Sequence, residues 1–485
     1  MHQQLKLYYC GLVLLLLTGF CAQAQVASSP NLNLLQILED HDSTGARSSS
    51  SSNHFIIGDI TVEGNYKTKD YIVKRELPFS TGDSIYLPDL VKGFEIGRQQ
   101  LMNTKLFNEA IISVKSFRGY VVDIRVEVKE RWYIFPIPYA KAVDRNINEF
   151  FRQGVGIQRI NYGFKFQYNN FTGRNDKLKI WLITGYTQQL QFEYEQPYAD
   201  RTLKHGYKLG MTYSFNREIN YATINNQQQF SDSFGGTRRW YAHVDYTYRP
   251  GLRTFNSVRL ALVRQDIDSA VINANPKYFF GGKTSIVFPE LSYNLNYYKV
   301  DYIPYPLKGW MGEVSFLKRG FSSEMNMWQF GGKLMNNWDL KKKWYFSTQT
   351  QAVIRLPFEQ PFVNQRMFGF GDMYLRGLER YVVDGVAAFL SRSTLRKEII
   401  RFKVPTHLKS KSHSEVPFQF YARVFGDWGS VYNKVNPENS LTNKLLYTYG
   451  VGLDMVSFYD FVVRFDYSFN QLGQNGVFLH IKSDF

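Results

Sequence analysis

Apolar and polar side chains alternate with a period of two along most of the chain, from about Ile134 to Phe485. Clear examples are residues 190–195, 240–249 and 461–469, in which aliphatic or aromatic residues occupy every second position. Because successive side chains of a strand point to opposite faces, each segment predicts a strand with one apolar and one polar face. About sixteen such segments fit into roughly 350 residues, which predicts a transmembrane antiparallel β-barrel with lipid outside and a polar lumen inside. A soluble sandwich would also alternate, but it has no enclosed polar face.

Residues 54–131 have a mixed pattern, which predicts a small α+β domain in front of the barrel that spans residues 132–485. The turn pair Gly64-Asn65 ends the first strand, and Pro88 suits the first turn of a helix. The expected order is strand, helix, helix, strand and strand, at residues 55–63, 69–76, 88–104, 110–117 and 120–128.

Residues 1–24 predict a secretory signal peptide. Lys6 precedes an apolar run, and Ala22-Gln-Ala24 has the small-x-small form of a cleavage site. Cys21 leaves open the alternative of a lipid anchor, although Phe20 is larger than the residue usual before a lipidated cysteine. The serine-rich residues 25–53 predict a disordered tether, because they hold too little apolar surface to form a core.

Composition favours an exported membrane protein. Both cysteines, Cys10 and Cys21, lie in the expected leader, so the mature chain would form no disulfide. Aromatic residues make up 17% of the chain. No segment after the leader approaches the roughly twenty apolar residues of a spanning helix. These properties predict residence in the outer membrane, with the N-terminal domain in the periplasm.

A formal net charge of +16 restricts the expected partners. Basic chains often bind nucleic acid, but export argues against that partner here. Lipopolysaccharide, anionic lipid headgroups or acidic protein segments are the expected counter-charges. Alternatively, the cationic side chains line a wet lumen. The chain has no Gly-x-Ser-x-Gly, His-Glu-x-x-His or phosphate-loop motif, so we expect no enzyme, no cofactor and no metal site.

Connections between the predicted strands alternate in length. Short ones at residues 339–343 and 457–460 are expected on the periplasmic side, and longer ones at 216–239, 359–385 and 427–444 on the extracellular side. The most informative connection contains Arg376-Gly377, between about the eleventh and twelfth strands. The cation on this loop and the anion of Asp427 on an inward-facing strand position together predict a loop that folds back into the lumen.

Strand phase gives this arginine two candidate partners. Asp427 shares the inward face of its strand with Gln419, Tyr421 and Arg423, and is the first candidate. Glu398 is in phase with Arg392, Thr394 and Arg396, and is the second. A guanidinium held by one or two carboxylates in a confined lumen would act as a charge-assisted latch. Alternatively, Arg376 is a solvated residue at the tip of a loop.

The two ends of the barrel sequence predict a seam. Pro136 and Pro138 are two residues apart, so one side of the first strand lacks two ladder donors. If that side faces the last strand, the seam is weak and can open laterally. Alternatively, both prolines belong to the linker. The terminal Phe485 is in phase with Val477, Leu479 and Ile481 on the lipid face.

The small N-terminal domain, the barrel, the loop arginine and the terminal strand together resemble the superfamily of BamA-type and two-partner-secretion transporters. The resemblance covers residues 54–485 and is strongest at Gly369–Tyr381, Phe425–Val431 and Phe478–Phe485. It implies that residues 54–131 form one POTRA domain, that Arg376 pairs with Asp427, and that Gly377 permits a tight turn. It also implies that the final aromatic serves as an assembly signal. This chain departs from the family's Arg-Gly-aromatic motif at Leu378.

The expected function is assembly or translocation of proteins at the outer membrane. The POTRA domain would capture unfolded outer-membrane or secreted clients, for example by β-augmentation, and the barrel would pass them into or across the membrane. Other envelope assembly subunits are possible partners. A pore and an accessory subunit of an envelope complex are the two alternatives, and a single POTRA domain favours a specialised role.

Overall fold

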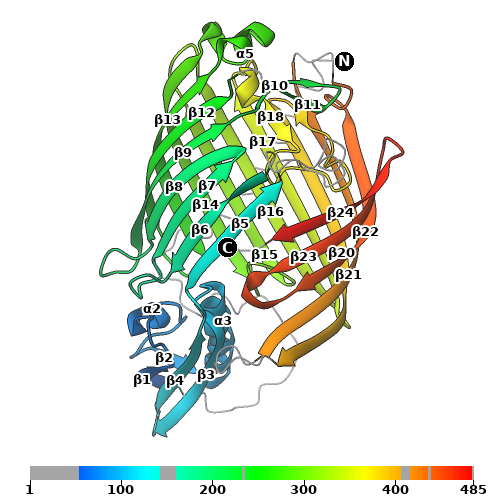
Figure 1. Ribbon diagram of the computed structural model, residues 1–485. Coiled ribbons are helices and arrows are strands. Elements are labelled where there is room, and N and C mark those ends of the chain that lie inside the picture. The colour runs from blue at the N-terminus through cyan, green and yellow to red at the C-terminus, as the bar shows by residue number, and fades with distance from the viewer. Residues whose placement is uncertain (1–53, 143–159, 232–234, 406–414, 435–438, 483–485) are drawn as a thin grey trace.

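A small α+β domain and a large barrel of strands make up the chain in the computed structural model (Figure 1). The structure describes residues 54–142, 160–231, 235–405, 415–434 and 439–482. The predicted leader and tether lie outside these residues, and so does Phe485. No helix in the described part of the chain is long and apolar enough to cross a membrane.

The N-terminal domain packs two helices on one sheet. The sheet has the strand order β2-β1-β4-β3. Leu90 and Leu101 are fully buried against the hydrophobic face of the sheet, which includes Val122 and Ile124. The predicted order of elements is confirmed with one addition, the strand β2, which is too short to produce an alternating pattern. The elements are β1 (His54–Glu63), α2 (Asp70–Arg75), β2 (Ser84–Tyr86), α3 (Leu87–Asn103), β3 (Phe107–Arg118) and β4 (Val121–Glu130).

The barrel wall is an antiparallel sheet of sixteen strands, which confirms the predicted fold class. Its first half consists of β5 (Ile134–Ala142), β6 (Ile160–Asn169), β7 (Lys177–Gly185), β8 (Thr187–Gln196), β9 (His205–Asn216), β12 (Thr237–Tyr248), β13 (Thr254–Ile267) and β14 (Ser285–Val300). Its second half consists of β15 (Gly309–Arg319), β16 (Met327–Lys341), β17 (Trp344–Leu356), β20 (Ala387–Pro405), β21 (Glu415–Tyr432), β22 (Leu445–Val456), β23 (Val462–Asn470) and β24 (Asn475–Lys482).

Side chains alternate across this wall as the period of two predicts. On β12, Val244 and Tyr246 point outward and are about half exposed. His243 and Asp245, between and beside them, are buried on the inner side. The outer face therefore presents apolar side chains to lipid, and the inner face carries the polar and charged groups.

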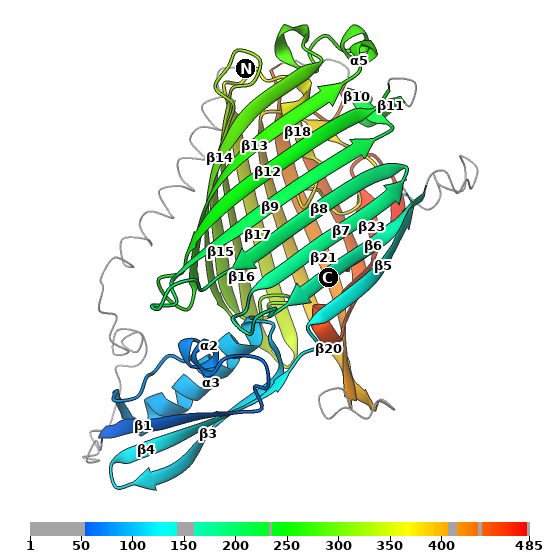
Figure 2. The same cartoon turned by 60° about the vertical axis from the view of Figure 1, so that its left-hand side comes forward.

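The two ends of the barrel differ in how they are covered. The N-terminal domain lies at the end where short turns connect the strands (Figure 2). Long connections at the other end carry the barrel's small additional elements. These are β10 (Ile219–Ile224), β11 (Gln227–Ser231), α5 (Ser269–Ala274), η4 (Phe280–Gly282), η5 (Phe362–Asn364), β18 (Arg366–Phe368) and β19 (Val383–Asp384). A single 3-10 turn, η6 (Phe458–Asp460), lies on the side of the N-terminal domain.

Candidate functional site: a loop latched inside the barrel

The connection between β17 and β20 folds into the lumen. Its central residues Leu375 and Leu378 are buried, and they pack in one hydrophobic cluster with Leu390, Val431 and Leu446 of the wall. These apolar contacts place the loop against β20, β21 and β22. A loop of this length stays inside because it buries side chains there, and the polar contacts of Arg376 then fix its position.

Arg376 and Asp427 form a buried ion pair. Nε of Arg376 donates to Oδ2 of Asp427 at 2.8 Å, and Nη2 donates to Oδ1. The backbone N–H of Arg376 donates to the same carboxylate at 3.1 Å, and Nη1 donates to Thr394 at 3.0 Å. The two side chains are 8% and 0% exposed. The bidentate geometry fixes both the direction and the depth of the loop.

The aromatic contact of the arginine comes from the wall. The guanidinium of Arg376 lies 4.1 Å from the centroid of the Phe425 ring. Leu378, where the family motif has an aromatic residue, packs instead in the hydrophobic cluster of the loop. Arg376 therefore still stacks on an aromatic ring, that of Phe425, although the motif position Leu378 is not aromatic.

Gly377 brings the loop close to the strand β23. Its φ of +96° is in the left-handed region, and a Cβ at this position would lie 2.8 Å from Cβ of Ser468. Its carbonyl accepts a hydrogen bond from Nδ2 of Asn470 at 2.8 Å. Any larger residue would push the loop away from β23.

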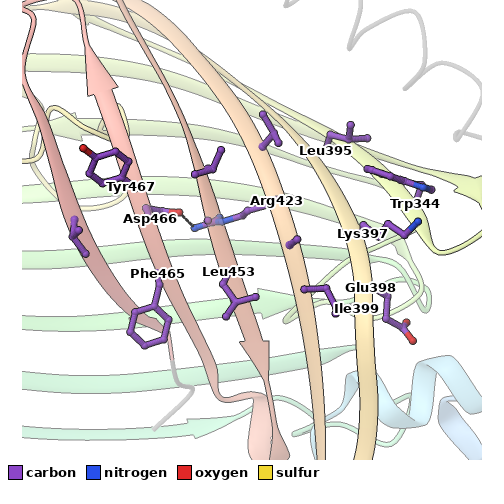
Figure 3. Close-up of a pocket in the computed structure, with 15 residues that line it drawn as sticks. Trp344, Leu395, Lys397, Glu398, Ile399, Arg423, Leu453, Phe465, Asp466 and Tyr467 are labelled. Carbon is purple, nitrogen blue, oxygen red and sulfur yellow. Dashed lines mark hydrogen bonds and ion pairs between the residues drawn. The ribbon is translucent and has the colours of Figure 1, made fainter.

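The prediction that Glu398 is a second partner of Arg376 is wrong. Glu398 lies 3.4 Å from Nζ of Lys343 and 2.9 Å from Nη2 of Arg401. Glu398 does lie on the inward face of β20, as its strand phase predicts, but it lies too far along the strand to reach Arg376. It is four residues beyond Thr394, which Arg376 contacts, and that separation is about 13 Å along a strand. Figure 3 shows Glu398 apart from the Arg423–Asp466 pair and near the N-terminal domain.

Further contacts join the loop to the last strands. Nε of Arg392 on β20 donates to the carbonyl of Tyr374 at 3.1 Å. The Tyr374 ring stacks on His480 of β24 at 5.5 Å. Nε2 of His480 lies 3.3 Å from Oε1 of Glu379. The loop thus contacts β20, β21, β23 and β24 from inside, and we call this group of contacts the latch.

A second layer of buried, charged side chains lies beside the latch. Arg423 pairs with Asp466, as Figure 3 shows, and its Nε lies 3.0 Å from Oδ1 of Asp454. Tyr305 donates to the other oxygen of Asp454 at 2.7 Å. Gly452 leaves space for this layer, because a Cβ there would lie 2.4 Å from Oδ1 of Asp466. This layer cross-links β21, β22 and β23.

Pro136 and Pro138 lie within the strand β5, where they face Phe166 and Phe164 of β6. The N–H of Asn169 donates to the carbonyl of Tyr133, which identifies the hydrogen-bonded pairs of this ladder. The pairs alternate, so Pro136 and Pro138 are at non-bonded positions and their nitrogens face away from β6. The missing donors lie on the free edge of β5, on the side of β24. Within the described residues, no backbone pairing joins β5 to β24.

Three of the long connections meet at the end of the barrel away from the N-terminal domain. Asn226, at the tip of the β10–β11 hairpin, is 1% exposed. Its N–H donates to Oδ1 of Asn439 at 2.7 Å, and its carbonyl accepts from the N–H of Val382 at 2.8 Å. These three connections therefore meet at one buried asparagine.

The N-terminal domain is docked on the barrel through another buried ion pair. Nη1 and Nη2 of Arg249 donate to the two oxygens of Glu76 at 2.6 and 2.7 Å. Tyr198 donates to Oε1 of Glu76 at 3.1 Å, and Nε of Arg75 donates to the carbonyl of Leu203 at 2.7 Å. We call these residues the dock. They join the end of α2 to the short turns β8–β9 and β12–β13.

Sequence reasoning missed the dock and the second charge layer. Glu76 and Arg249 are 173 positions apart and lie in no motif, so nothing in the pattern links them. Arg423 was placed on the inward face, but its partners Asp454 and Asp466 were not identified. Alternation within a strand predicts a face and gives no information about the height of a side chain relative to other strands.

Comparison with known proteins agrees with this architecture. Residues 170–385 match the sequence model of the Omp85 superfamily domain, and residues 55–131 match POTRA, described as a surface antigen variable number repeat. Over 133 residues the chain is 29% identical to the outer membrane protein assembly factor BamA of Neorickettsia risticii (strain Illinois). This match spans 27% of the chain and only 16% of that relative.

Two solved structures have a similar fold. BamA from Haemophilus ducreyi, in a structure that lacks POTRA domains 1–3, has a TM-score of 0.50 at 16% identity. The match covers 88% of this chain and 84% of that one. CdiB from Escherichia coli has a TM-score of 0.51 at 11% identity, over 88% and 75% of the two chains.

The fold and the matched domains define an outer-membrane β-barrel that carries a periplasmic POTRA domain. Residues 170–385 therefore carry an Omp85 superfamily domain, and residues 55–131 carry a POTRA domain. The POTRA domain therefore identifies the barrel end with short turns as periplasmic.

Proposed function

We propose that this protein inserts or translocates polypeptides at the outer membrane and that it does so by opening the barrel between β5 and β24. The POTRA domain captures the client, and the barrel passes it into or across the membrane. The observation that carries the proposal is the seam itself. Pro136 and Pro138 remove two donors from the edge of β5 that faces β24.

The latch supports this proposal because it keeps one side of the seam in order. The loop around Arg376 contacts β20, β21, β23 and β24 from the lumen. Strands held in this way do not depend on pairing with β5 for their position. The seam can then open on the side of β5 while β20–β24 remain one block.

Contacts between the extracellular loops favour this function over a pore. A passive channel needs a continuous aqueous path, and the contacts of Asn226 bring three connections together over the lumen. The dock supports client transfer, because it holds the POTRA domain in one orientation beneath the barrel. Lipopolysaccharide and other envelope subunits remain proposed partners.

The decisive experiment is the outer-membrane proteome after depletion of the protein. Broad loss of β-barrel proteins is the expected result. Loss of one secreted protein would instead restrict the function to a dedicated transporter. Loss of small-solute uptake alone would identify a pore, and an unchanged proteome with failure of one envelope complex would identify an accessory subunit. Either of the last two outcomes would overturn the proposal.

The seam has a more specific test. The mature chain is expected to lack cysteine. One cysteine introduced on β5 and one on β24 would therefore have only each other as a disulfide partner. A disulfide across the seam should stop client insertion, and reduction should restore it. A matched pair on β9 and β12, which share a complete ladder, should leave insertion unchanged. Normal insertion with the seam locked would rule out lateral opening.

A further inference from the structure

Strands β20 and β21 continue beyond the barrel wall as a two-stranded ribbon. Pairing of β20 with β17 ends at Lys397, and pairing of β21 with β22 ends at Gln419. The β20–β21 ladder continues to Pro405 and Glu415. Residues 398–405 extend about 25 Å along the strand direction. Figure 2 shows the pair descending below the barrel on the side of the POTRA domain. We call residues 398–405 and 415–419 the periplasmic ribbon.

Aromatic side chains near the base of the ribbon mark the membrane boundary. Trp338 and Trp344, at the β16–β17 turn, are 45% and 37% exposed on the outer face. Exposed aromatic residues at the rim of an outer-membrane barrel lie at the lipid headgroups. Trp344 is paired with Lys397, the last residue before the ribbon. The ribbon therefore lies in the periplasm, beyond the hydrocarbon layer.

One face of the ribbon is apolar although it lies outside the membrane. Ile400, Phe402 and Val404 share the outward face of β20 and are 50%, 41% and 42% exposed. The Phe402 ring stacks on Phe418 and Phe420 at 5.7 and 6.1 Å. This face continues the lipid-facing side of the wall into water. A contiguous exposed apolar surface of this kind marks an interaction site.

On the opposite face of the ribbon, charged side chains form ion pairs with one another. Arg401 pairs with Glu398 at 2.9 Å, and Lys403 pairs with Glu415 at 2.9 Å. The ladder itself has a register shift between Glu398 and Ile400, which places Ile400, Phe402 and Val404 on the outward face. Only the apolar face is left without a covering layer within the described residues.

The edges of the ribbon discourage the addition of another strand. Lys403 and Pro405 lie on β20, and Pro417 lies on β21. Lysine and proline on edge strands are the usual protection against edge-to-edge pairing. A partner would therefore pack on the face of the ribbon.

The base of this face is basic. Lys341 and Lys342, in the turn beside the ribbon, are exposed, and so is Lys397. Lys343 lies between them and Glu398, with which it pairs. An acidic surface is the electrostatic complement of this rim.

We propose that the apolar face of the periplasmic ribbon is a docking site for a second protein, which presents an apolar patch rimmed by carboxylates. This partner lies beside the barrel at the periplasmic surface of the outer membrane. The proposal depends on the periplasmic position of the ribbon and is independent of whether the barrel inserts clients.

The first test is photo-crosslinking in intact cells. A benzophenone amino acid replaces Phe402, and the control replaces Phe321, which is 70% exposed at the extracellular end. A discrete adduct with one periplasmic or lipid-anchored polypeptide is expected at position 402 and absent at 321. Adducts with lipid alone, with a second copy of this chain, or with no molecule would overturn the proposal.

The second test uses the full-length protein in detergent with the purified polypeptide from that adduct. Phe402→Ser combined with Val404→Ser should weaken binding at least tenfold. Lys341→Glu combined with Lys342→Glu should weaken it severalfold and remove most of its salt dependence. Phe321→Ser should bind as the unaltered protein does. Heat-modified gel mobility verifies that each variant is folded. Equal affinity of all variants would contradict the assignment of this face.

Discussion

Two buried arginine–carboxylate pairs serve different purposes in this molecule. Arg376 and Asp427 join a loop to the wall of the same barrel, whereas Arg249 and Glu76 join two domains. Both pairs are bidentate, and each has one further hydroxyl partner, Thr394 in the latch and Tyr198 in the dock. The two ion pairs have the same chemistry, but one connects a loop to a wall and the other connects two domains.

Because the two pairs connect different parts of the molecule, the loss of each pair is expected to have a different effect. The latch lies inside the barrel, so its loss disturbs the strands next to the seam. The dock lies at the periplasmic rim, so its loss frees a domain that has its own hydrophobic core. We therefore expect latch variants to change the barrel, and dock variants to change the position of the POTRA domain relative to an intact barrel.

The largest expected effect follows from Arg376→Ala. It leaves the carboxylate of Asp427 buried without its charge partner, which costs about 3–5 kcal/mol. The temperature at which the barrel loses its heat-modifiable gel mobility should fall strongly. Arg376→Lys should give an intermediate loss, because an ammonium cannot form the bidentate pair.

A matched control is Arg264→Ala. Arg264 also pairs with an aspartate, Asp266 at 3.1 Å, but its side chain is 57% exposed. Surface pairs contribute about 0–1 kcal/mol, so the transition should move little. An equal effect of the two substitutions, or a stable barrel with Arg376→Ala, would show that the latch has no structural role.

The next effect is expected from Glu76→Gln. The substitution leaves Arg249 charged and buried at the interface, at a cost of about 3–5 kcal/mol to docking. The POTRA domain should separate from the barrel, and distances between spin labels on the two bodies should broaden. The barrel transition should stay unchanged, which is the opposite of the result for Arg376. The control is Glu95→Gln in α3, since the Glu95–Arg98 pair is exposed on both sides.

The dock also predicts a pH dependence. Burial alone would raise the pKa of Glu76, but the charge and hydrogen bonds of Arg249 outweigh it, so the pKa is below its ordinary 4.5. A lowered folded pKa gives stabilisation that is complete above the unfolded value and is lost as the pH falls through the folded value. Spin-label distances should therefore be constant from neutral pH to about 4.5 and should broaden only below it. Broadening near pH 6 would contradict this assignment.

The same comparison shows what could be predicted from sequence. Alternation predicted the strands, and strand phase placed Asp427 on the inner face, because a period of two identifies the side of each residue. Phase could not distinguish Asp427 from Glu398, because height in the barrel depends on the stagger between strands. Glu76 and Arg249 each lie in ordinary polar sequence, and only the docking of two bodies brings them together.

The smallest expected effect tests whether the latch and the seam act on the same structure. Pro136→Val and Pro138→Val together restore two donors on the edge of β5 that faces β24, each worth about 0.5–1.5 kcal/mol if it is paired. Both positions face outward, so valine is compatible with the surrounding lipid. The transition temperature should rise slightly, and client insertion should slow. In combination with Arg376→Ala, the double change should recover part of the lost stability, because a stronger seam holds strands that the latch no longer holds. Strict additivity of the two changes would mean that latch and seam stabilise separate parts of the barrel.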